Sequence, residues 1–437
     1  MINIIDDLDQ RGLIADSTGR DNLQQILENP INFYCGFDPT ATSLHLGNLL
    51  PIILMKRLQN EGHRPIVLVG GATGGIGDPS GKDKERNMLN NQEILQNCEA
   101  IQQQLSTFID FEGNNAAKLV NNADWLGEFS LMSWLRDVGK HINITQMIAK
   151  DSVKQRLSSE SGISYTEFSY QLLQAYDFYH LSIRNNCLLQ VGGSDQWGNM
   201  TAGIQLTRKL EKKEVHALTH PLITTADGKK FGKSEGNAIW LDERKTSAFE
   251  LYQYLLNLSD DDIEKMLLMF SFHSVSDIKS LIAEHQKTPE KRLAQHHLAY
   301  ELVELVHSKE KATSAQRNST AMFTGDYKAL SSDELVSCFK GCETIRINSG
   351  ELIEGKKLTE LLITSKLAAS SNKAKTLIAQ GGIAINEEKI TDVDYIVTVD
   401  DLLPTSGDLT LKRGKKTYAL VQVFTQATAQ IIRHAFS

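Results

Sequence analysis

The segment 32–69 constrains the fold most, because it combines the patterns of a strand, a turn, a helix and a second strand within a short stretch. The aromatic-rich run 33–37 ends at the Asp-Pro-Thr turn signal 38–40. Apolar residues in 46–58 then recur three and four positions apart, which buries one face of a helix. The continuous apolar run 65–69 is typical of a strand covered on both faces of a parallel sheet. The segment therefore predicts a β-α-β unit.

A second unit of this kind starts at the apolar run 187–191, turns over 192–195 and continues as a helix from about 196 to 210. Two such units predict an α/β fold, a Rossmann-like domain with a doubly wound parallel sheet over 1–225. The stretch of about 90–180 between them has mainly helical periodicity. We interpret it as an insertion that joins the two halves.

The remainder of the chain predicts two further domains. Helical patterns follow one another over 247–316, which indicates an α-helical domain over 226–323. A polar stretch containing Gly325 predicts a linker, placed at 324–350. The final part, 351–437, is expected to form a small α+β domain.

The final part combines helix and strand signals with a relatively basic composition. Ser370 or Ser371 can cap a helix over 372–379, and short alternating strands follow at 383–385 and 409–411. It holds eleven Lys and Arg against ten Asp and Glu, whereas the whole chain has a formal net charge of -8. The overall charge excludes a generally basic nucleic-acid coat, but a local RNA-binding surface remains possible.

The composition is that of an ordinary globular protein. Hydrophobic residues make up 41% and charged residues 23% of the chain, which excludes disordered and collagen-like classes. No stretch approaches the ~18 apolar residues of a membrane span. The N-terminal segment 1–20 lacks the apolar core of a signal peptide. We therefore expect a protein without membrane association.

The cysteines indicate a reducing compartment and no structural metal. Five cysteines without a regular framework fit a cytoplasmic protein better than a secreted disulfide scaffold. Cys338 and Cys342 could supply two zinc ligands, but no second Cys/His pair lies close in the sequence. We therefore predict no tightly bound metal that protein side chains ligate.

The first chemical motif is Leu-His-Leu-Gly-Asn at 44–48, where the first predicted helix begins. Free backbone N–H groups at a helix start favour a phosphate, and an adjacent imidazole can donate to it. A surface histidine that caps its own helix is the simpler alternative. The motif resembles the HIGH signature of class I aminoacyl-tRNA synthetases, which implies a catalytic role for His45 and Asn48. Asn48 replaces the second histidine, and its amide can still donate a hydrogen bond.

The second motif is Lys-Lys-Phe-Gly-Lys-Ser at 229–234, which follows Asp-Gly. Solubilising surface charge is the simpler explanation of such a run. The motif resembles the KMSKS loop of the same class. This resemblance implies that Lys230, Lys233 and Ser234 bind the β- and γ-phosphates of ATP and stabilise departing pyrophosphate. Ammonium groups suit this task because negative charge develops on the departing oxygens.

A third set of residues indicates the substrate. Tyr170, Gln174 and Asp177 are spaced by four and three positions, so a helix places them on one face, where buried polar groups need partners. Together with Tyr34 and Asp78, the run 168–178 is similar to tyrosyl-tRNA synthetases. The resemblance implies that Tyr34 and Asp177 bind the phenolic hydroxyl of tyrosine. It also implies that Asp78, Tyr170 and Gln174 bind its ammonium group, with Gln190 near the tyrosyl group.

A fourth motif, Val-Gly-Gly-Ser-Asp-Gln-Trp-Gly-Asn at 191–199, suits a nucleotide, because its glycines allow close backbone approach and Asp195 can bind ribose hydroxyls. It too is similar to the tyrosyl enzymes. In addition, Lys82 and Arg86 align with family residues that close over pyrophosphate, although their loop alone reads as solvated charge. The residues expected in catalysis are Thr40, His45, Asn48, Lys82, Arg86, Lys230, Lys233 and Ser234. Those expected to bind ATP or the adenylate are Cys35, Gly36, Asp38, Gly47, Gly192, Asp195, Gln196, Lys230 and Lys233.

The segment 357–399 resembles the small S-four-like RNA-binding domain. The resemblance implies that Lys373, Lys375 and Lys389 face RNA phosphates. A solvated helix face is the alternative interpretation of these lysines.

The resemblance to bacterial-type tyrosyl-tRNA synthetases spans essentially the whole chain. It implies a homodimer that uses L-tyrosine, ATP with Mg²⁺ and tRNA(Tyr), without a separate editing domain. A short nucleotidyltransferase would share the first motif but lack the later domains. A tryptophan-specific relative is disfavoured by the pair Tyr34 and Asp177, which suits a phenol better than an indole. A catalytically retired RNA-binding protein would be expected to lose its pocket carboxylates and loop lysines.

Overall fold

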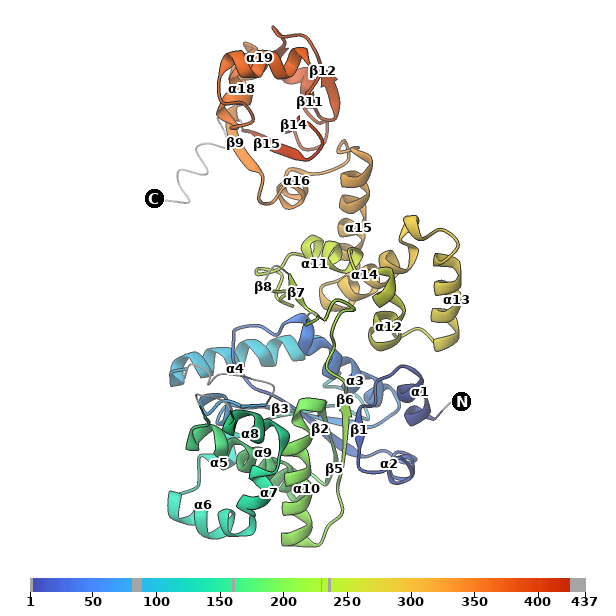
Figure 1. The fold of residues 1–437 in the computed structure, drawn as a ribbon, viewed down its shortest axis with the longest axis vertical. Helices are drawn as coiled ribbons and strands as arrows, with labels where there is room; N and C mark the ends of the chain where they lie inside the picture. The colour runs from blue at the N-terminus through green and yellow to red at the C-terminus, as the bar shows by residue number, and fades with distance from the viewer. Residues whose placement is uncertain (1–2, 81–88, 159–161, 229, 235–236, 425–437) are drawn as a thin grey trace. The chain divides into compact units, whose positions relative to one another are not determined.

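The computed structural model consists of two compact units, shown as ribbons in Figure 1. The first comprises Met1–Thr246 and Tyr254–His307, and the second comprises Ser247–Gln253 and Ser308–Ser437. The structure describes residues 3–80, 89–158, 162–228, 230–234 and 237–424. Among these residues, no helix combines the length and the apolarity that crossing a bilayer requires.

The first unit is built on a six-stranded sheet in the order β1-β6-β5-β2-β3-β4. The strands β6, β5, β2, β3 and β4 are parallel, and β1 pairs antiparallel with β6. This arrangement confirms the predicted α/β class, with the change of strand order between β2 and β5. Ligands of such sheets bind beyond the carboxyl ends of the strands at this point. The bounds are β1 Asp16–Ser17, β2 Asn32–Phe37, β3 Arg64–Val69, β4 Lys118–Asn121, β5 Cys187–Gly193 and β6 His216–His220.

Helices flank this sheet as the two predicted units require. After β2 the chain forms a 3₁₀ turn, Leu46–Asn48, and then α3, Leu49–Asn60, whose apolar side chains are buried. Pro51 lies in the first turn of α3, where its missing N–H has no intrahelical partner. After β5 comes α10, Trp197–Glu211, which packs along α9, Tyr165–Arg184 (Figure 1). Two short helices precede β2: α1 Ile4–Gln10 and α2 Arg20–Ile26.

The segment expected to be a helical insertion contains a strand as well. It forms α4 Asn91–Leu105, α5 Ala123–Leu126, α6 Leu131–Asp137, α7 Ile144–Ile148, α8 Asp151–Leu157 and α9. Between α4 and α5, however, β4 pairs with β3 and extends the sheet, with Val67 opposite Leu119. Because β4 has only four residues and two of them are exposed, it carries no apolar run that would mark it in the sequence.

The helical region after the sheet confirms the helical periodicity of the sequence. It comprises α11 Ala248–Leu256, α12 Asp260–Phe270, α13 Val275–His285, α14 Leu293–Val306 and α15 Lys309–Thr324. One face of α14 is buried at Ala294, Leu298 and Leu302. Helices α12, α13 and α14 pack on one another within the first unit, whereas α15 belongs to the second.

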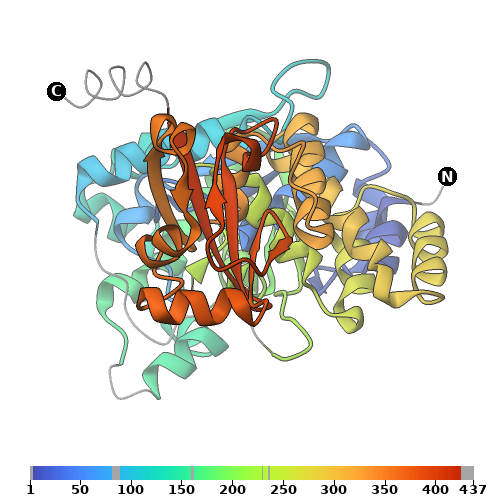
Figure 2. The ribbon, with the colours of Figure 1, turned by 90° about the horizontal axis from the view of Figure 1, so that it is seen from above.

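The second unit contains a five-stranded sheet in the order β12-β11-β14-β15-β9, which is seen from above in Figure 2 (orange to red). The expected linker 324–350 differs from the structure, because it contains α16, Ser332–Cys338, and β9, Glu343–Asn348, which pairs parallel with β15. The predicted helix is α19, Ser371–Ala379, and Ser370 caps it. The remaining elements are α17 Ser349–Ile353, β10 Lys356–Lys357, α18 Leu358–Thr364, β11 Ile383–Ile385, β12 Glu388–Ile390, β13 Ile396–Val397, β14 Leu409–Arg413 and β15 Thr417–Phe424.

Candidate active site

A cavity of about 430 Å³ opens beyond the carboxyl ends of β2 and β5, between the start of α3 and the helices α9 and α10. Its position is the one expected for a ligand in a doubly wound sheet. It collects most of the residues that the sequence motifs predicted, although these are far apart in the chain. The predicted residues that line it are Tyr34, Cys35, Gly36, Asp38, Thr40, His45, Gly47, Asn48, Asp78, Tyr170, Gln174, Asp177, Gln190, Gly192, Asp195 and Gln196.

Tyr34 and Asp177 are among the most buried polar residues of the cavity, at 1% and 2% exposed. The carboxylate of Asp177 accepts hydrogen bonds from Trp125 Nε1 at 2.8 Å and Asn122 Nδ2 at 3.0 Å, which fix its orientation. In contrast, the Tyr34 hydroxyl and Gln190 Oε1 are buried without a hydrogen-bond partner among the described residues. An unsatisfied buried group costs about 1–3 kcal/mol. The cavity is therefore suited to a ligand that supplies a polar group at this end.

Burial also sets the ionisation of this pair. It raises the pKa of Asp177 to about 7, although the hydrogen bonds from Asn122 and Trp125 act in the opposite direction. Burial and the charge of Asp177 raise the pKa of the Tyr34 hydroxyl well above its ordinary value. Tyr34 is therefore a hydrogen-bond donor at neutral pH, while Asp177 is divided between its two forms until a ligand shifts the balance.

Two further carboxylates lie in the cavity beside polar partners. Asp38 accepts from Tyr170 Oη at 2.7 Å and from Thr73 Oγ1 at 2.8 Å. Asp78 accepts from Gln196 Nε2 at 2.7 Å. Among the described residues that line the cavity there is no Lys or Arg. The excess of carboxylates therefore favours a ligand that carries a cationic group.

The start of α3 lies at the rim of the cavity. The His45 N–H donates to Asn48 Oδ1 at 3.1 Å, so Asn48 caps the turn that His45 begins. The His45 ring covers Gly47, where a Cβ atom would lie only 2.9 Å from the ring. Glycine at this position therefore leaves room for the imidazole beside the backbone.

The lysine motif approaches the same helix start through its backbone. Gly232 has φ +83° and donates its N–H to the Tyr254 hydroxyl at 2.8 Å. A Cβ atom on Gly232 would lie 3.0 Å from the backbone nitrogen of Gly47. After it, β7 Lys233–Ser234 pairs antiparallel with β8 Asn237–Ala238. The structure thus brings the backbones of the two predicted signature motifs together.

Several residues predicted for the site do not line the cavity, or they lie outside the residues that the structure describes. Lys230 is exposed and does not line the cavity. Lys82 and Arg86 lie outside the described residues, as do the side chains of Lys233 and Ser234. Their proposed roles are therefore carried by the sequence motifs alone.

Known proteins share both the sequence and its domain pattern. A family model described as tRNA synthetases class I (W and Y) matches residues 27–324, and one described as the Tyrosine--tRNA ligase SYY-like C-terminal domain matches residues 334–421. The chain is 48% identical to Tyrosine--tRNA ligase 1 of Bacillus licheniformis over 96% of this chain and 99% of the relative. The chain belongs to the tyrosine–tRNA ligase family. The Tyrosine--tRNA ligase of Laribacter hongkongensis is 47% identical over 96% of this chain and 98% of its own.

A solved structure agrees with this assignment to the tyrosine–tRNA ligases. The C-terminally truncated mitochondrial tyrosyl-tRNA synthetase of Aspergillus nidulans matches with a TM-score of 0.67 and 33% identity, over 74% of this chain and 95% of that one. The predicted class I synthetase fold is therefore confirmed.

In this tyrosine–tRNA ligase family member, the residues that orient Asp177 were not found from the sequence. Asn122 and Trp125 follow β4, which itself was not predicted. Asn199, which donates to Gln174 Oε1 at 2.9 Å, lies within the fourth motif but was not singled out. The polar residues that follow residue 120 could have indicated these partners, because polar residues just after a parallel strand lie at the edge of the sheet where ligands bind.

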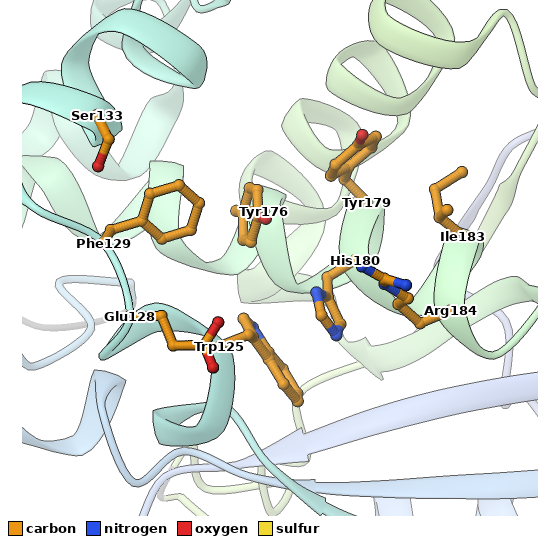
Figure 3. A pocket seen from close by; sticks show the side chains of 9 residues that line it. All are labelled: Trp125, Glu128, Phe129, Ser133, Tyr176, Tyr179, His180, Ile183 and Arg184. Atoms are coloured by element: carbon orange, nitrogen blue, oxygen red, sulfur yellow. The ribbon is translucent and has the colours of Figure 1, made fainter.

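A second cavity of about 390 Å³ lies near Trp125 in the ligase (Figure 3). The Trp125 ring stacks on His180 with centroids 4.4 Å apart, and aromatic side chains of α9 continue the wall. The residues that line it are Trp125, Glu128, Phe129, Ser133, Tyr176, Tyr179, His180, Ile183 and Arg184. None of them was predicted as a site residue.

The predicted RNA-binding lysines lie on the second unit of the ligase. Lys373 and Lys375 are exposed on α19, and Lys389 is exposed on β12. The Lys389 side chain lies against Gly381, just after α19. The structure thus leaves all three ammonium groups available to solvent.

Proposed function

We propose that the chain is a tyrosine–tRNA ligase that activates L-tyrosine with ATP and then transfers the tyrosyl group to the terminal adenosine of tRNA(Tyr). The observation that carries this proposal is the buried and unpartnered Tyr34 hydroxyl in the same cavity as the fixed carboxylate of Asp177. Together they offer one hydrogen-bond donor and one acceptor to a phenolic hydroxyl. Phenylalanine would leave the Tyr34 hydroxyl unpaired and would offer no donor to Asp177, which disfavours its binding.

The cationic end of tyrosine suits the second group of cavity residues. Asp78, Tyr170 and Gln174 are the residues proposed to bind the ammonium group, with Gln190 beside the tyrosyl group. Asp78 supplies the compensating charge, and its bond from Gln196 keeps its carboxylate oriented. This division of polar groups between the two ends supports an amino acid with a phenolic side chain.

The adenosine part of ATP is proposed to lie between β2 and the glycine-containing motif 191–199. Gly36 and Gly192 both line this space, and a Cβ on Gly192 would lie 2.9 Å from Met200 Cε, so glycine is needed there. Asp195 is proposed to bind ribose hydroxyls, and Gln196 and Asp38 to complete the site. Cys35, Thr40 and Gly47 also line this side of the cavity.

In the first chemical step, the tyrosine carboxylate attacks the α-phosphorus of ATP, and pyrophosphate leaves. No protein nucleophile is needed, so catalysis depends on positioning and on stabilising negative charge. His45 and Asn48 at the helix start are proposed to donate to the phosphates. Departing pyrophosphate is proposed to be stabilised by Lys230, Lys233 and Ser234 of the lysine motif, together with Lys82 and Arg86. Mg²⁺ is proposed to enter the site bound to the ATP substrate.

Pyrophosphate exchange into ATP tests this proposal directly, without tRNA. We expect exchange with tyrosine and none with phenylalanine or tryptophan as controls. Exchange with tryptophan instead would assign the pocket to the other amino acid of this synthetase group. A folded protein that exchanges with no amino acid would indicate the catalytically retired RNA-binding alternative.

The second unit is proposed to bind tRNA through an S-four-like surface that includes Lys373, Lys375 and Lys389. Their exposure on one small α+β domain supports this role. The three free cysteines of the first unit, Cys35, Cys98 and Cys187, are buried, which is consistent with the proposed cytoplasmic location.

We also propose that the chain forms a homodimer through an apolar face of α6, α7, α8 and the start of α9. These helices carry several exposed apolar side chains, and such exposure is typical of an interaction surface. The exposed members are Leu131, Met132, Leu135, Ile144, Ile148, Leu157 and Tyr165.

A charge on this apolar face is expected to dissociate the homodimer. Tyr165 is 76% exposed, so Tyr165→Asp leaves the fold of one chain intact but buries a carboxylate in the interface. Analytical ultracentrifugation should show monomer for this variant at concentrations where the wild type is a dimer. Phe323→Asp is the matched control, because Phe323 is exposed on the second unit. A wild-type monomer, or a Tyr165→Asp dimer, would contradict the proposed interface.

A further inference from the structure

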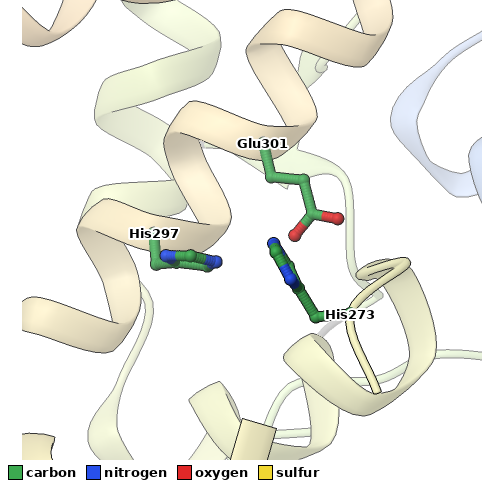
Figure 4. A group of neighbouring side chains, drawn as sticks. All are labelled: His273, His297 and Glu301. Carbon is green, nitrogen blue, oxygen red and sulfur yellow. The ribbon is translucent and has the colours of Figure 1, made fainter. Parts of the chain in front are cut away.

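Two histidines and a glutamate converge in the helical part of the first unit (Figure 4). His273 lies on the loop between α12 and α13, whereas His297 and Glu301 are one turn apart on α14. Their potential ligand atoms all lie within 4.8 Å of one another. The expectation of no protein-ligated metal rested on Cys338 and Cys342 without a Cys/His pair close to them in the sequence, whereas these three residues come together only through the packing of α12 and α14.

The Glu301 carboxylate is held in place but is not fully used. Its Oε1 accepts the backbone N–H of Phe272 at 2.8 Å, which orients the carboxylate toward the loop that carries His273. Its Oε2 is buried and has no hydrogen-bond partner among the described residues. A buried carboxylate oxygen without a donor is costly, so it is available to a cation.

The two imidazoles complete a set of three ligands. Their ring centroids are 4.9 Å apart with planes tilted by 55°, so the rings are not stacked. A neutral imidazole has a lone pair for a metal, and two imidazoles with one carboxylate are a donor set typical of Zn²⁺.

The backbone around His273 is fixed before any ion binds. Arg11 Nη2 donates to the His273 carbonyl at 2.7 Å, and Arg57 donates to the Ser271 carbonyl. Arg57 also lies over the Phe272 ring at 5.0 Å and is attracted to Glu301. This arginine partly offsets the carboxylate charge, but it leaves the imidazole nitrogens unaffected as ligands. Because the loop is already ordered, binding requires only rotation of side chains, chiefly that of the exposed His273.

We propose that His273, His297 and Glu301 bind one Zn²⁺ ion, with water as the fourth ligand. The bound ion connects the α12–α13 loop to α14. Ligand atoms of a tetrahedral zinc at about 2.0–2.2 Å lie closer together than in the present side-chain positions, so the three side chains move inward when the ion binds. The site lies outside the tyrosine and ATP cavity, and its role is to stabilise the helical region. Mg²⁺ does not replace Zn²⁺ here, because it prefers oxygen ligands and octahedral geometry.

Isothermal titration calorimetry of the full chain with Zn²⁺ tests the proposal. We expect one site in the wild type, and a loss of affinity of at least about tenfold in His297→Ala, His273→Ala and Glu301→Gln. Glu301→Gln keeps an acceptor for the Phe272 N–H, and His273 is exposed, so both variants should stay folded. His296→Ala is the matched control, because His296 is the neighbour of His297 on α14 but not one of the three ligands.

Two further readouts separate a specific site from stray binding. Zn²⁺ should raise the midpoint of thermal unfolding of the wild type and of His296→Ala but not of the site variants, while Mg²⁺ should have no such effect at this site. Co²⁺ should give visible absorption bands of a tetrahedral ion only where all three ligands are present. Absence of Zn²⁺ binding by the wild type, or undiminished binding by His273→Ala and His297→Ala, would overturn the proposal.

Discussion

Asp177→Asn is expected to lower kcat/KM for tyrosine in pyrophosphate exchange by about 100-fold, because the substrate phenol loses an ionised acceptor. The amide cannot accept from the phenol as strongly, and Trp125 and Asn122 no longer face a carboxylate. Tyr34→Phe is the comparison variant. It removes a neutral donor and should cost less, about tenfold. Similar, small losses in both variants would contradict the proposed recognition of the phenol.

The pH dependence of kcat/KM for tyrosine should show that the ionised form of Asp177 is the active one. With a pKa of about 7, Asp177 becomes protonated as the pH falls below neutrality, and its carboxyl then no longer accepts the phenol as an anion. Wild-type kcat/KM for tyrosine should therefore fall toward tenfold per pH unit below about 7 and level off above it. Asp177→Asn should lack this limb. An unchanged acid limb in the variant would assign the ionisation to another group.

The same substitution should change how the stability of the ligand-free protein depends on pH, which separates a loss of recognition from misfolding. Burial raises the folded-state pKa of Asp177 above its ordinary value of 3.8, so the folded state binds the proton more tightly than the unfolded state. The contribution of this group is therefore lost as the pH rises through the window from about 4 to 7. Asp177→Asn removes this dependence. Its thermal midpoint relative to wild type should be higher at pH 8 than at pH 5.

Lys233→Ala is expected to slow tyrosyl-adenylate formation by about 10²–10³-fold while leaving tyrosine affinity nearly unchanged. The lysine motif approaches the start of α3 through Gly232, beside the proposed phosphate site. A cation there acts on the charge of departing pyrophosphate, which develops only in the transition state. Single-turnover kinetics and equilibrium dialysis of tyrosine separate the two effects.

Lys279→Ala serves as the control for Lys233→Ala, because Lys279 is exposed on α13, away from both signature motifs. It should leave both the rate and the affinity unchanged. An equal loss of rate and of tyrosine affinity in Lys233→Ala would contradict a role confined to the transition state.

The elements of the first sheet that were predictable share a strong local pattern. The strands β2, β3 and β5 have apolar runs, because parallel strands are buried on both faces. In contrast, half of the residues of β4 and of β9 are exposed, and the positions of these strands depend on pairing with β3 and β15. Local sequence contains no such information about pairing, so these two strands appeared as part of an insertion and a linker.

In the candidate site, too, the residues within a strong local motif were predictable, whereas those that depend on tertiary pairing were not. Motif residues such as His45, Tyr170 and Asp195 could be predicted to lie together, since they occupy strand ends or one helix face. The partners that orient them could not all be predicted. Trp125 and Asn122 depend on β4, and the bond of Tyr170 to Asp38 depends on how α9 packs against the sheet.

The position of β2 in the sheet has a consequence for synthesis of the chain on the ribosome. Asn32 pairs with Arg64 on one side and with Cys187 on the other. At about 5–20 residues per second, the second neighbour emerges on the order of ten seconds after the first. During that interval β2, which carries Tyr34, has an open hydrogen-bonding edge that can pair with other nascent chains. The strand that carries Tyr34 into the candidate active-site cavity therefore passes through an aggregation-prone stage while the protein is being made.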